Sequence, residues 1–268
     1  MLKDITLGQF FPGNSPIHRL DPRTKLVMLV VYIVALFVAV SWISYAVMLA
    51  FLILAVGISQ IPPKNIVRGM KPLVIILIFT GVLNIFFTEG EHVVVAFWKL
   101  KITMEGLQRA FFMVLRILML ITGTFLLTYT TSPIALTDGL ESLMNPLKVI
   151  KVPVHELAMM MCIALRFIPT LIEETDKIMS AQKARGADFE NGKLMDRVKA
   201  LIPILVPLFV SAFRRADELA TAMECRCYHG GEGRTKMKLL RYMRRDYVTY
   251  GIGVMLLGVI ITLASFGL

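Results

Sequence analysis

The sequence has few cysteines and lacks the short motifs of the common enzyme classes. Its three cysteines, Cys162, Cys225 and Cys227, are an odd number, which excludes a disulfide framework and suits a reducing compartment. It contains no G-x-x-x-x-G-K-[ST] phosphate loop, no H-E-x-x-H and no G-x-S-x-G. We therefore predict a non-catalytic chain that binds no cofactor of its own. We also predict no metal site, because the cysteines of C-x-C-x-H (residues 225–229) would point apart on a helix.

Apolar residues are in excess. They make up 56% of 268 residues, and the mean hydropathy is +0.70, whereas soluble domains are about 45–50% apolar. They are gathered in blocks close to the roughly 20 residues that a membrane-spanning helix needs. The predicted fold class is an all-α integral membrane protein with about five transmembrane helices, at Leu26–Val40, Trp42–Ile58, Pro72–Thr88, Ala110–Thr131 and Tyr247–Leu268. His92–Ile102, between two of them, alternates apolar and polar residues and is either a short hairpin or a re-entrant piece.

The formal net charge is +10, and the basic residues fall in alternate loops. The N-terminal arm, the loop Ile61–Lys71 and the stretch Ser132–Asp246 are rich in Lys and Arg, whereas the intervening loops are poor in them or balanced. The positive-inside rule therefore places the N-terminus in the cytoplasm and the C-terminus outside. The basic excess predicts contact with the anionic surface of a lipid bilayer and disfavours nucleic acid as a partner.

The stretch between the fourth and fifth spans is too charged to cross a membrane and too apolar for a solvated linker. The predicted organisation is an N-terminal arm with four spans (residues 1–131), a cytoplasmic coupling domain of amphipathic helices (132–246) and a C-terminal span (247–268). The coupling domain is predicted to contain five helices, Pro133–Ile150, Val154–Ile172, Glu173–Arg185, Lys193–Arg215 and Asp217–Tyr228.

Two of these helices are predicted to end in the same way. Arg185 lies in the last turn before Gly186, and Arg226 lies before a cysteine and then the pair Gly230-Gly231. Glycine favours the left-handed turn that closes a helix, and an arginine there is stabilised by the helix dipole. That capping role alone explains either arginine. Two such cations would also suit two similar acidic grooves on a soluble partner, because guanidinium binds carboxylate through two hydrogen bonds.

Four segments of the chain carry a family resemblance. They are PGNSPIHRLDPRTKL (Pro12–Leu26), ALRFIP (Ala164–Pro169), AQKARGA (Ala181–Ala187) and FRRADELATAMECRCYHGGEGRTKM (Phe213–Met237). With them the whole chain resembles the T component of energy-coupling factor (ECF) transporters, the CbiQ/EcfT-like family. The resemblance implies a multi-pass subunit of a prokaryotic cell membrane that serves vitamin or metal uptake.

The resemblance also implies partners and site residues. The family's two Ala-Arg-Gly signatures correspond to Ala184-Arg185-Gly186 and to Cys225-Arg226-Cys227, where cysteines flank the arginine. In the family these arginines bind two ABC-type ATPase subunits, which carry the ATP and Mg²⁺. The glycine-dependent chain reversal after Arg226 is expected to shift to Gly230-Gly231.

The apolar parts of the coupling domain are candidates for a second contact. Met159, Met160 and Met161 are either ordinary core or a surface that adapts to several partners. The resemblance favours contact with substrate-binding S components, with Pro203 and Pro207 on the opposite wall. Arg116, inside the fourth span, either snorkels to the interface or has a functional role. Two alternatives are a free-standing permease with its own substrate path and a membrane scaffold that binds a soluble partner through its basic segment.

Overall fold

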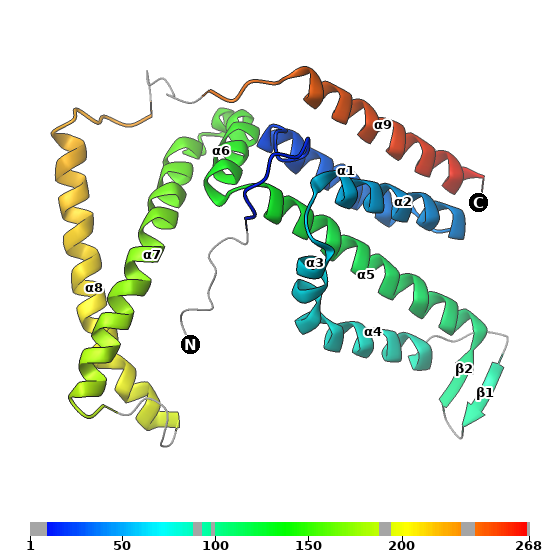
Figure 1. Ribbon diagram of the computed structural model, residues 1–268, viewed down its shortest axis with the longest axis horizontal. Coiled ribbons are helices and arrows are strands. Elements are labelled where there is room, and N and C mark those ends of the chain that lie inside the picture. The colour runs from blue at the N-terminus through cyan, green and yellow to red at the C-terminus, as the bar shows by residue number, and fades with distance from the viewer. Residues whose placement is uncertain (1–9, 88–92, 98–99, 188–193, 232–238, 267–268) are drawn as a thin grey trace. The chain divides into compact units, whose positions relative to one another are not determined.

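A computed structural model describes residues 10–87, 93–97, 100–187, 194–231 and 239–266 (Figure 1). The chain folds into two compact units. The first, here called the bundle unit, comprises residues 8–139 and 240–268. The second, the hairpin unit, comprises residues 140–239. These boundaries are close to those of the predicted coupling domain, whose cytoplasmic location stays a prediction.

The bundle unit is built from long helices and one two-stranded antiparallel sheet. Its elements are α1 (Pro22–Val38), α2 (Trp42–Ser59), α3 (Pro63–Met70), the 3-10 turn η2 (Lys71–Leu73), α4 (Val74–Phe87), β1 (Val93–Phe97), β2 (Leu100–Thr103), α5 (Met104–Thr130) and α9 (Arg244–Ser265). The two strands pair as a hairpin, with Phe97 opposite Leu100. Of the two interpretations of His92–Ile102, the short hairpin is therefore the one found.

Five helices of the described chain are long and apolar enough to cross a membrane. Four of them, α2, the stretch Pro63–Phe87, α5 and α9, correspond to predicted spans. The fifth is α7 (Val154–Ala184), which begins in the apolar part of the predicted coupling domain. The predicted first span corresponds to α1, which has 17 residues and is at the short end of the range for a transmembrane helix. The predicted fold class is confirmed.

The core of the bundle unit lies where α1, α2, α5 and α9 meet. Leu36, Met48, Met119 and Ile260, one from each helix, are all at most 1% exposed. Many of the other apolar side chains of these helices are half-buried or exposed, as expected where lipid takes the place of water. The core therefore fixes the four helices against one another and leaves their outer faces for the bilayer.

Arg116 has a structural explanation. Its Nε donates to the hydroxyl of Tyr45 at 2.8 Å, and one terminal nitrogen donates to the carbonyl of Ala39 at 3.1 Å. Ala39 is the C-cap of α1, where the helix dipole is negative and carbonyls lack partners within the helix. Arg116 thus joins α5 to the end of α1 and the first turn of α2, and the guanidinium has partners in the protein.

The segment PGNSPIHRLDPRTKL joins three helix ends in the bundle unit. Asp21 caps α1, and its own N–H donates to the carboxylate of Asp246 in the first turn of α9 at 2.9 Å. Lys25 donates to the carbonyl of Thr130, at the end of α5, at 2.8 Å. Asp246 and Lys25 are only 2% and 8% exposed. The polar residues of this segment therefore have a structural role that the sequence alone did not assign.

The hairpin unit corrects the predicted helix boundaries. Where four separate helices were expected, it has two continuous ones, α7 (Val154–Ala184) and α8 (Leu194–Glu224), each of 31 residues. The change from apolar to polar sequence at residues 172–173 and 215–217 contains neither glycine nor proline, so it does not break the helix. Pro169, Pro203 and Pro207 lie inside the helices.

The predicted helix Pro133–Ile150 is also shorter than expected. The α-helix α6 covers Pro133–Met144, and residues Asn145–Ile150 form a 3-10 helix, η3. Pro146 explains the change, since its ring disfavours the α conformation at the preceding residue.

Candidate functional site

The two helices α7 and α8 pack against each other as an antiparallel pair (Figure 1). Near the middle, Arg215 of α8 donates to the Glu174 carboxylate of α7 at 2.8 Å. Farther along, the Gln182 side chain approaches the Pro203 carbonyl at 3.5 Å. A cavity of about 310 Å³ lies between the helices, with small alanine side chains of α8 along one wall. In the described part of these helices, an ion pair and apolar packing therefore hold α7 against α8.

The end of α7 has the hydrogen bonds of a Schellman motif. Gly186 has a left-handed backbone, with φ +87°. Its N–H donates to the Lys183 carbonyl at 3.0 Å, and the N–H of Ala187 donates to the Gln182 carbonyl at 3.0 Å. Arg185 is the C-cap, the last residue before the left-handed one. The glycine thus turns the chain away and leaves Arg185 at the tip.

The end of α8 has the same motif with different residues. The N–H of Cys227 donates to the Glu224 carbonyl at 2.8 Å, and the N–H of Tyr228 donates to the Met223 carbonyl at 3.1 Å. Cys227 is itself left-handed, with φ 55°. Arg226 therefore occupies the position that Arg185 has on α7.

This finding corrects the expected chain reversal at Gly230-Gly231. The left-handed turn that ends α8 is made at Cys227, directly after the arginine, because the two capping hydrogen bonds fix it there. Gly230 has a second left-handed backbone, with φ +97°, which belongs to the following loop. A non-glycine residue in this region costs roughly 1–2 kcal/mol.

Both arginine side chains are exposed, and so are the predicted site residues Ala184 and Gly186. Among the described residues, neither guanidinium takes part in an ion pair or side-chain hydrogen bond. Each guanidinium lies at a helix C-terminus, where the negative end of the helix dipole stabilises a positive charge. Because α7 and α8 are antiparallel and each about 46 Å long, the two tips lie at opposite ends of the pair, roughly 40 Å apart. The structure therefore presents two matched cations, one at each end of the helix pair.

The residues predicted to contact a second partner are not brought together. Met160 and Met161 are 54% and 45% exposed near the start of α7, and Met159 is half-buried. Pro203 and Pro207 are exposed in the first half of α8. Since the helices are antiparallel, the methionines lie toward the Arg226 end and the prolines toward the Arg185 end. The role of these residues stays a prediction.

The sequence analysis did not predict an exposed apolar stripe on α8. Its members recur every three or four residues and are between 49% and 69% exposed, namely Ile202, Leu205, Val206, Phe209, Val210 and Phe213. The helical period of these residues is the signal that predicts such a face. An apolar stripe of this kind marks a surface for lipid or for another protein.

A contact at the base of the hairpin unit was also not predicted. Nδ1 of His155, in the first turn of α7, lies 3.0 Å from the Glu141 carboxylate of α6. Gly231 packs against the same ring so closely that an added Cβ would lie 2.6 Å from His155 Cδ2. The chain just after Arg226 is thus held against the start of α7, and no local sequence signal predicts contacts between residues so far apart.

Together, the spans and the two arginine-tipped helix ends define a multi-pass membrane protein with a long helical hairpin. Comparison with known proteins identifies the family within this class. Residues 13–237 match the family CbiQ, described as "Cobalt transport protein". The chain belongs to this CbiQ/EcfT family, the transmembrane components of energy-coupling factor transporters.

Relatives that cover almost the whole chain carry the name "Energy-coupling factor transporter transmembrane protein EcfT", among them three proteins from different organisms. The chain is 53% identical over 254 residues to that of Ruminiclostridium cellulolyticum, a match that covers 95% of both proteins. It is 57% identical over 249 residues to that of Thermosediminibacter oceani, covering 93% of this chain and 94% of the relative. It is 49% identical over 246 residues to that of Bacillus subtilis, covering 92% and 93%.

Proposed function

We propose that this chain is the subunit of a prokaryotic plasma-membrane importer that couples two ABC-type ATPase subunits to a substrate-binding S component. The observation that carries the proposal is the pair of exposed arginines at equivalent positions of two helix ends. Two equivalent arginines, one at each end of one helix pair, suit a partner with two similar grooves, such as a pair of related ATPases. Arg185 and Arg226 are the contact residues, with Ala184 and Gly186 beside the first.

ATP and Mg²⁺ are bound by the ATPases in this proposal, not by this chain. When the ATPases change their separation on binding ATP, they pull on the two arginine tips and alter the arrangement of α7 and α8. The ATP-bound pair must hold one arrangement better than the other, because otherwise no equilibrium is shifted. The apolar packing between α7 and α8, with the ion pair between Glu174 and Arg215, keeps the two helices together during that motion.

The S component rests on the apolar surface of the hairpin unit, where the motion of α7 and α8 reaches it. The stripe of α8 and the exposed methionines of α7 support this contact. The S component then reorients and releases a vitamin or other micronutrient into the cytoplasm. In this orientation the N-terminus and the hairpin unit are cytoplasmic and the C-terminus is outside.

The test is co-purification of the ATPases with Arg185→Ala, Arg226→Ala and the double variant, followed by ATP-dependent uptake. We expect each single variant to weaken assembly and the double variant to abolish it. Arg214→Ala is the matched control, since Arg214 is an exposed arginine on α8 away from its end. Normal assembly and uptake by the double variant would exclude the coupling role. Specific binding of a small molecule by the purified chain alone would favour a permease instead.

A further inference from the structure

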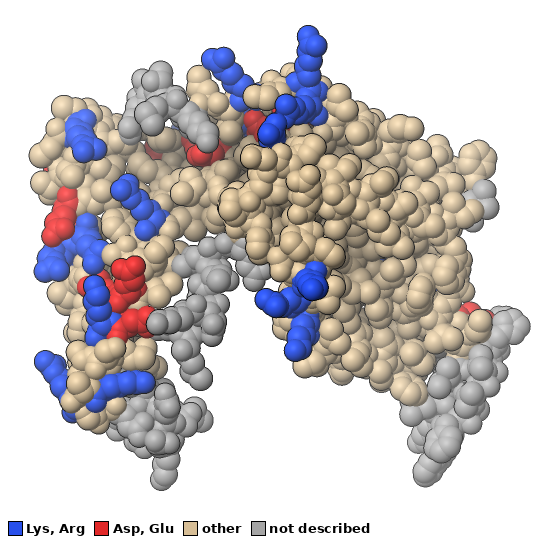
Figure 2. Space-filling model, in the orientation of Figure 1, with Lys and Arg blue, Asp and Glu red and all other residues tan. Residues whose placement is uncertain are grey.

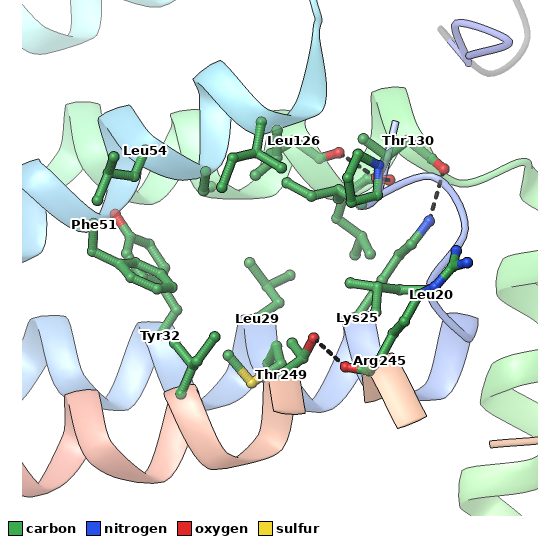
Figure 3. Close-up of a pocket in the computed structure, with 18 of the residues that line it drawn as sticks. Leu20, Lys25, Leu29, Tyr32, Phe51, Leu54, Leu126, Thr130, Arg245 and Thr249 are labelled. Carbon is green, nitrogen blue, oxygen red and sulfur yellow. Dashed lines mark hydrogen bonds between the residues drawn. The ribbon is translucent and has the colours of Figure 1, made fainter. Parts of the chain in front are cut away.

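The bundle unit contains a cavity of about 630 Å³ between α1, α2, α5 and α9 (Figure 3). Its lining is mostly aliphatic and aromatic, and the exceptions are the charged side chains of Lys25, Arg244 and Arg245 and the hydroxyls of Thr130 and Thr249. Figure 3 shows Lys25 at one end of the cavity and the rings of Tyr32 and Phe51 at the other. The cavity therefore has a cationic mouth and an apolar interior.

The depth of the cavity covers most of one leaflet of a bilayer. From Lys25 to Tyr32 on α1, the lining runs about two helical turns, or roughly 11 Å. One leaflet contributes about half of a hydrocarbon core that is about 30 Å thick. Tyr32 and Phe51 close the inner end, with ring centroids 6.3 Å apart. In the predicted orientation the mouth faces the cytoplasm, so the cavity lies within the inner leaflet.

The polar groups of the interior are already used within the protein. Lys25 donates to the Thr130 carbonyl, and the Thr130 hydroxyl donates to the carbonyl of Leu126 at 2.8 Å. The Tyr32 hydroxyl donates to the Met119 carbonyl at 3.2 Å. The interior thus offers little to a polar solute, and an apolar chain is the ligand that fits it.

The two arginines at the mouth differ from these groups. Arg244 and Arg245 are exposed in the first turn of α9, and no ion pair in the described part of the chain uses them. Cations are disfavoured at a helix N-terminus, where the dipole is positive. Figure 2 shows Lys and Arg at the start of α9 with acidic atoms beside them, while the adjoining face of the bundle unit is almost uncharged. The acidic residue of this turn, Asp246, is buried and accepts hydrogen bonds from the N–H groups of Asp21 and Met243. An anion bound at the mouth would offset this local positive charge.

We propose that the cavity binds one anionic phospholipid of the inner leaflet, with an acyl chain inside it and the phosphate between Arg244 and Arg245. The cavity has three separate features, namely an apolar interior, a depth within one leaflet and a cationic mouth. A phospholipid fits all three. A transmembrane helix of a partner would need a groove along the whole bilayer, and Tyr32 and Phe51 close this cavity midway. The lipid would hold α9 against α1, α2 and α5.

The test uses the full-length chain in detergent with phosphatidylglycerol or phosphatidylcholine of the same acyl chains, followed by native mass spectrometry. We expect one phosphatidylglycerol to bind at least about fivefold more tightly than phosphatidylcholine, since each arginine near a lipid surface contributes about 1 kcal/mol. The double variant Arg244→Gln/Arg245→Gln should lose this preference, and Arg244→Lys/Arg245→Lys should keep it. Arg241→Gln, an exposed arginine outside the cavity lining, is the control.

A second variant tests the interior without changing charge. Ala55→Trp should fill the cavity and reduce retention of both lipids, whereas Ala50→Trp, on an exposed position of the same helix, should not. Size-exclusion profiles and helical content establish that each variant is folded. Three results would overturn the proposal: unchanged binding by the arginine double variant, unchanged binding by Ala55→Trp, or displacement of the lipid by millimolar inorganic phosphate. The ATPase co-purification test is independent of all three.

Discussion

Arg185 and Arg226 occupy the same position in two copies of one helix-ending motif, although glycine follows the first and cysteine follows the second. The backbone hydrogen bonds that place each arginine are equivalent, so the two cations are presented in the same way. The difference lies in the cost of the turn, because only glycine adopts a left-handed backbone without steric strain.

This difference in strain predicts that substitutions at Cys227 and Gly186 change the stability of the two helix ends in opposite directions. Cys227→Gly should stabilise the end of α8 by about 1 kcal/mol, and Gly186→Ala should destabilise the end of α7 by a similar amount. An added Cβ at Gly186 meets no neighbouring atom, so backbone strain is the only cost. Hydrogen exchange of the amides at residues 186–187 and 227–228 measures both. Equal exchange in wild type and Cys227→Gly would contradict the assigned strain.

Arg116 gives a prediction for the bundle unit. Arg116→Met removes two hydrogen bonds from a charged donor, each worth about 1.5–3 kcal/mol, and leaves the Ala39 carbonyl without its partner. The thermal unfolding midpoint in detergent should therefore fall clearly. Tyr45→Phe removes only one of the two bonds and should have a smaller effect, and Arg116→Lys should be intermediate because lysine lacks the guanidinium fork. A stable Arg116→Met variant would instead favour a functional role.

Asp246 gives a prediction for the junction of α1 and α9. Its two carboxylate oxygens accept from the N–H groups of Asp21 and Met243, at 2.9 and 2.8 Å. Asp246→Asn replaces one acceptor with an amide donor and leaves a buried N–H without a partner, which costs about 1–3 kcal/mol. Thermal unfolding should show the loss, and Asp217→Asn, at an exposed position of α8, should not. An equal effect of both substitutions would contradict the role of burial.

The sequence predicted those parts of the structure that depend on local composition. The spans follow from apolar blocks, and the tip at Arg185 follows from the glycine after it. The turn at Cys227 could not be predicted, since cysteine rarely takes a left-handed backbone and two true glycines follow three residues later. The glycine pair therefore predicted the wrong position for the left-handed turn, and the capping hydrogen bonds place the turn at Cys227.

Features that depend on contacts between residues far apart in the sequence could not be predicted either. The partners of Arg116 lie at the end of α1 and in the first turn of α2, so the sequence around Arg116 gives no sign of them. The continuity of α7 is not evident from the sequence, because Pro169 and a change in polarity both indicate a boundary. Tertiary contacts, such as that between Glu174 and Arg215, favour a helix that continues past both.

The ion pair between Glu174 and Arg215 gives a prediction that links the structure to transport. Its side chains are 21% and 32% exposed, so its coupling energy should be less than about 1 kcal/mol. Glu174→Arg or Arg215→Glu places like charges between α7 and α8, and should lower both the thermal midpoint and ATP-driven uptake by the assembled transporter. The exchanged double variant Glu174→Arg/Arg215→Glu should recover part of both, because it restores opposite charges at the same place. Recovery of stability without uptake would indicate that α7 and α8 need more than their mutual attachment to transmit motion. If the double variant were worse than either single one, the two side chains would not act on each other as an ion pair between α7 and α8.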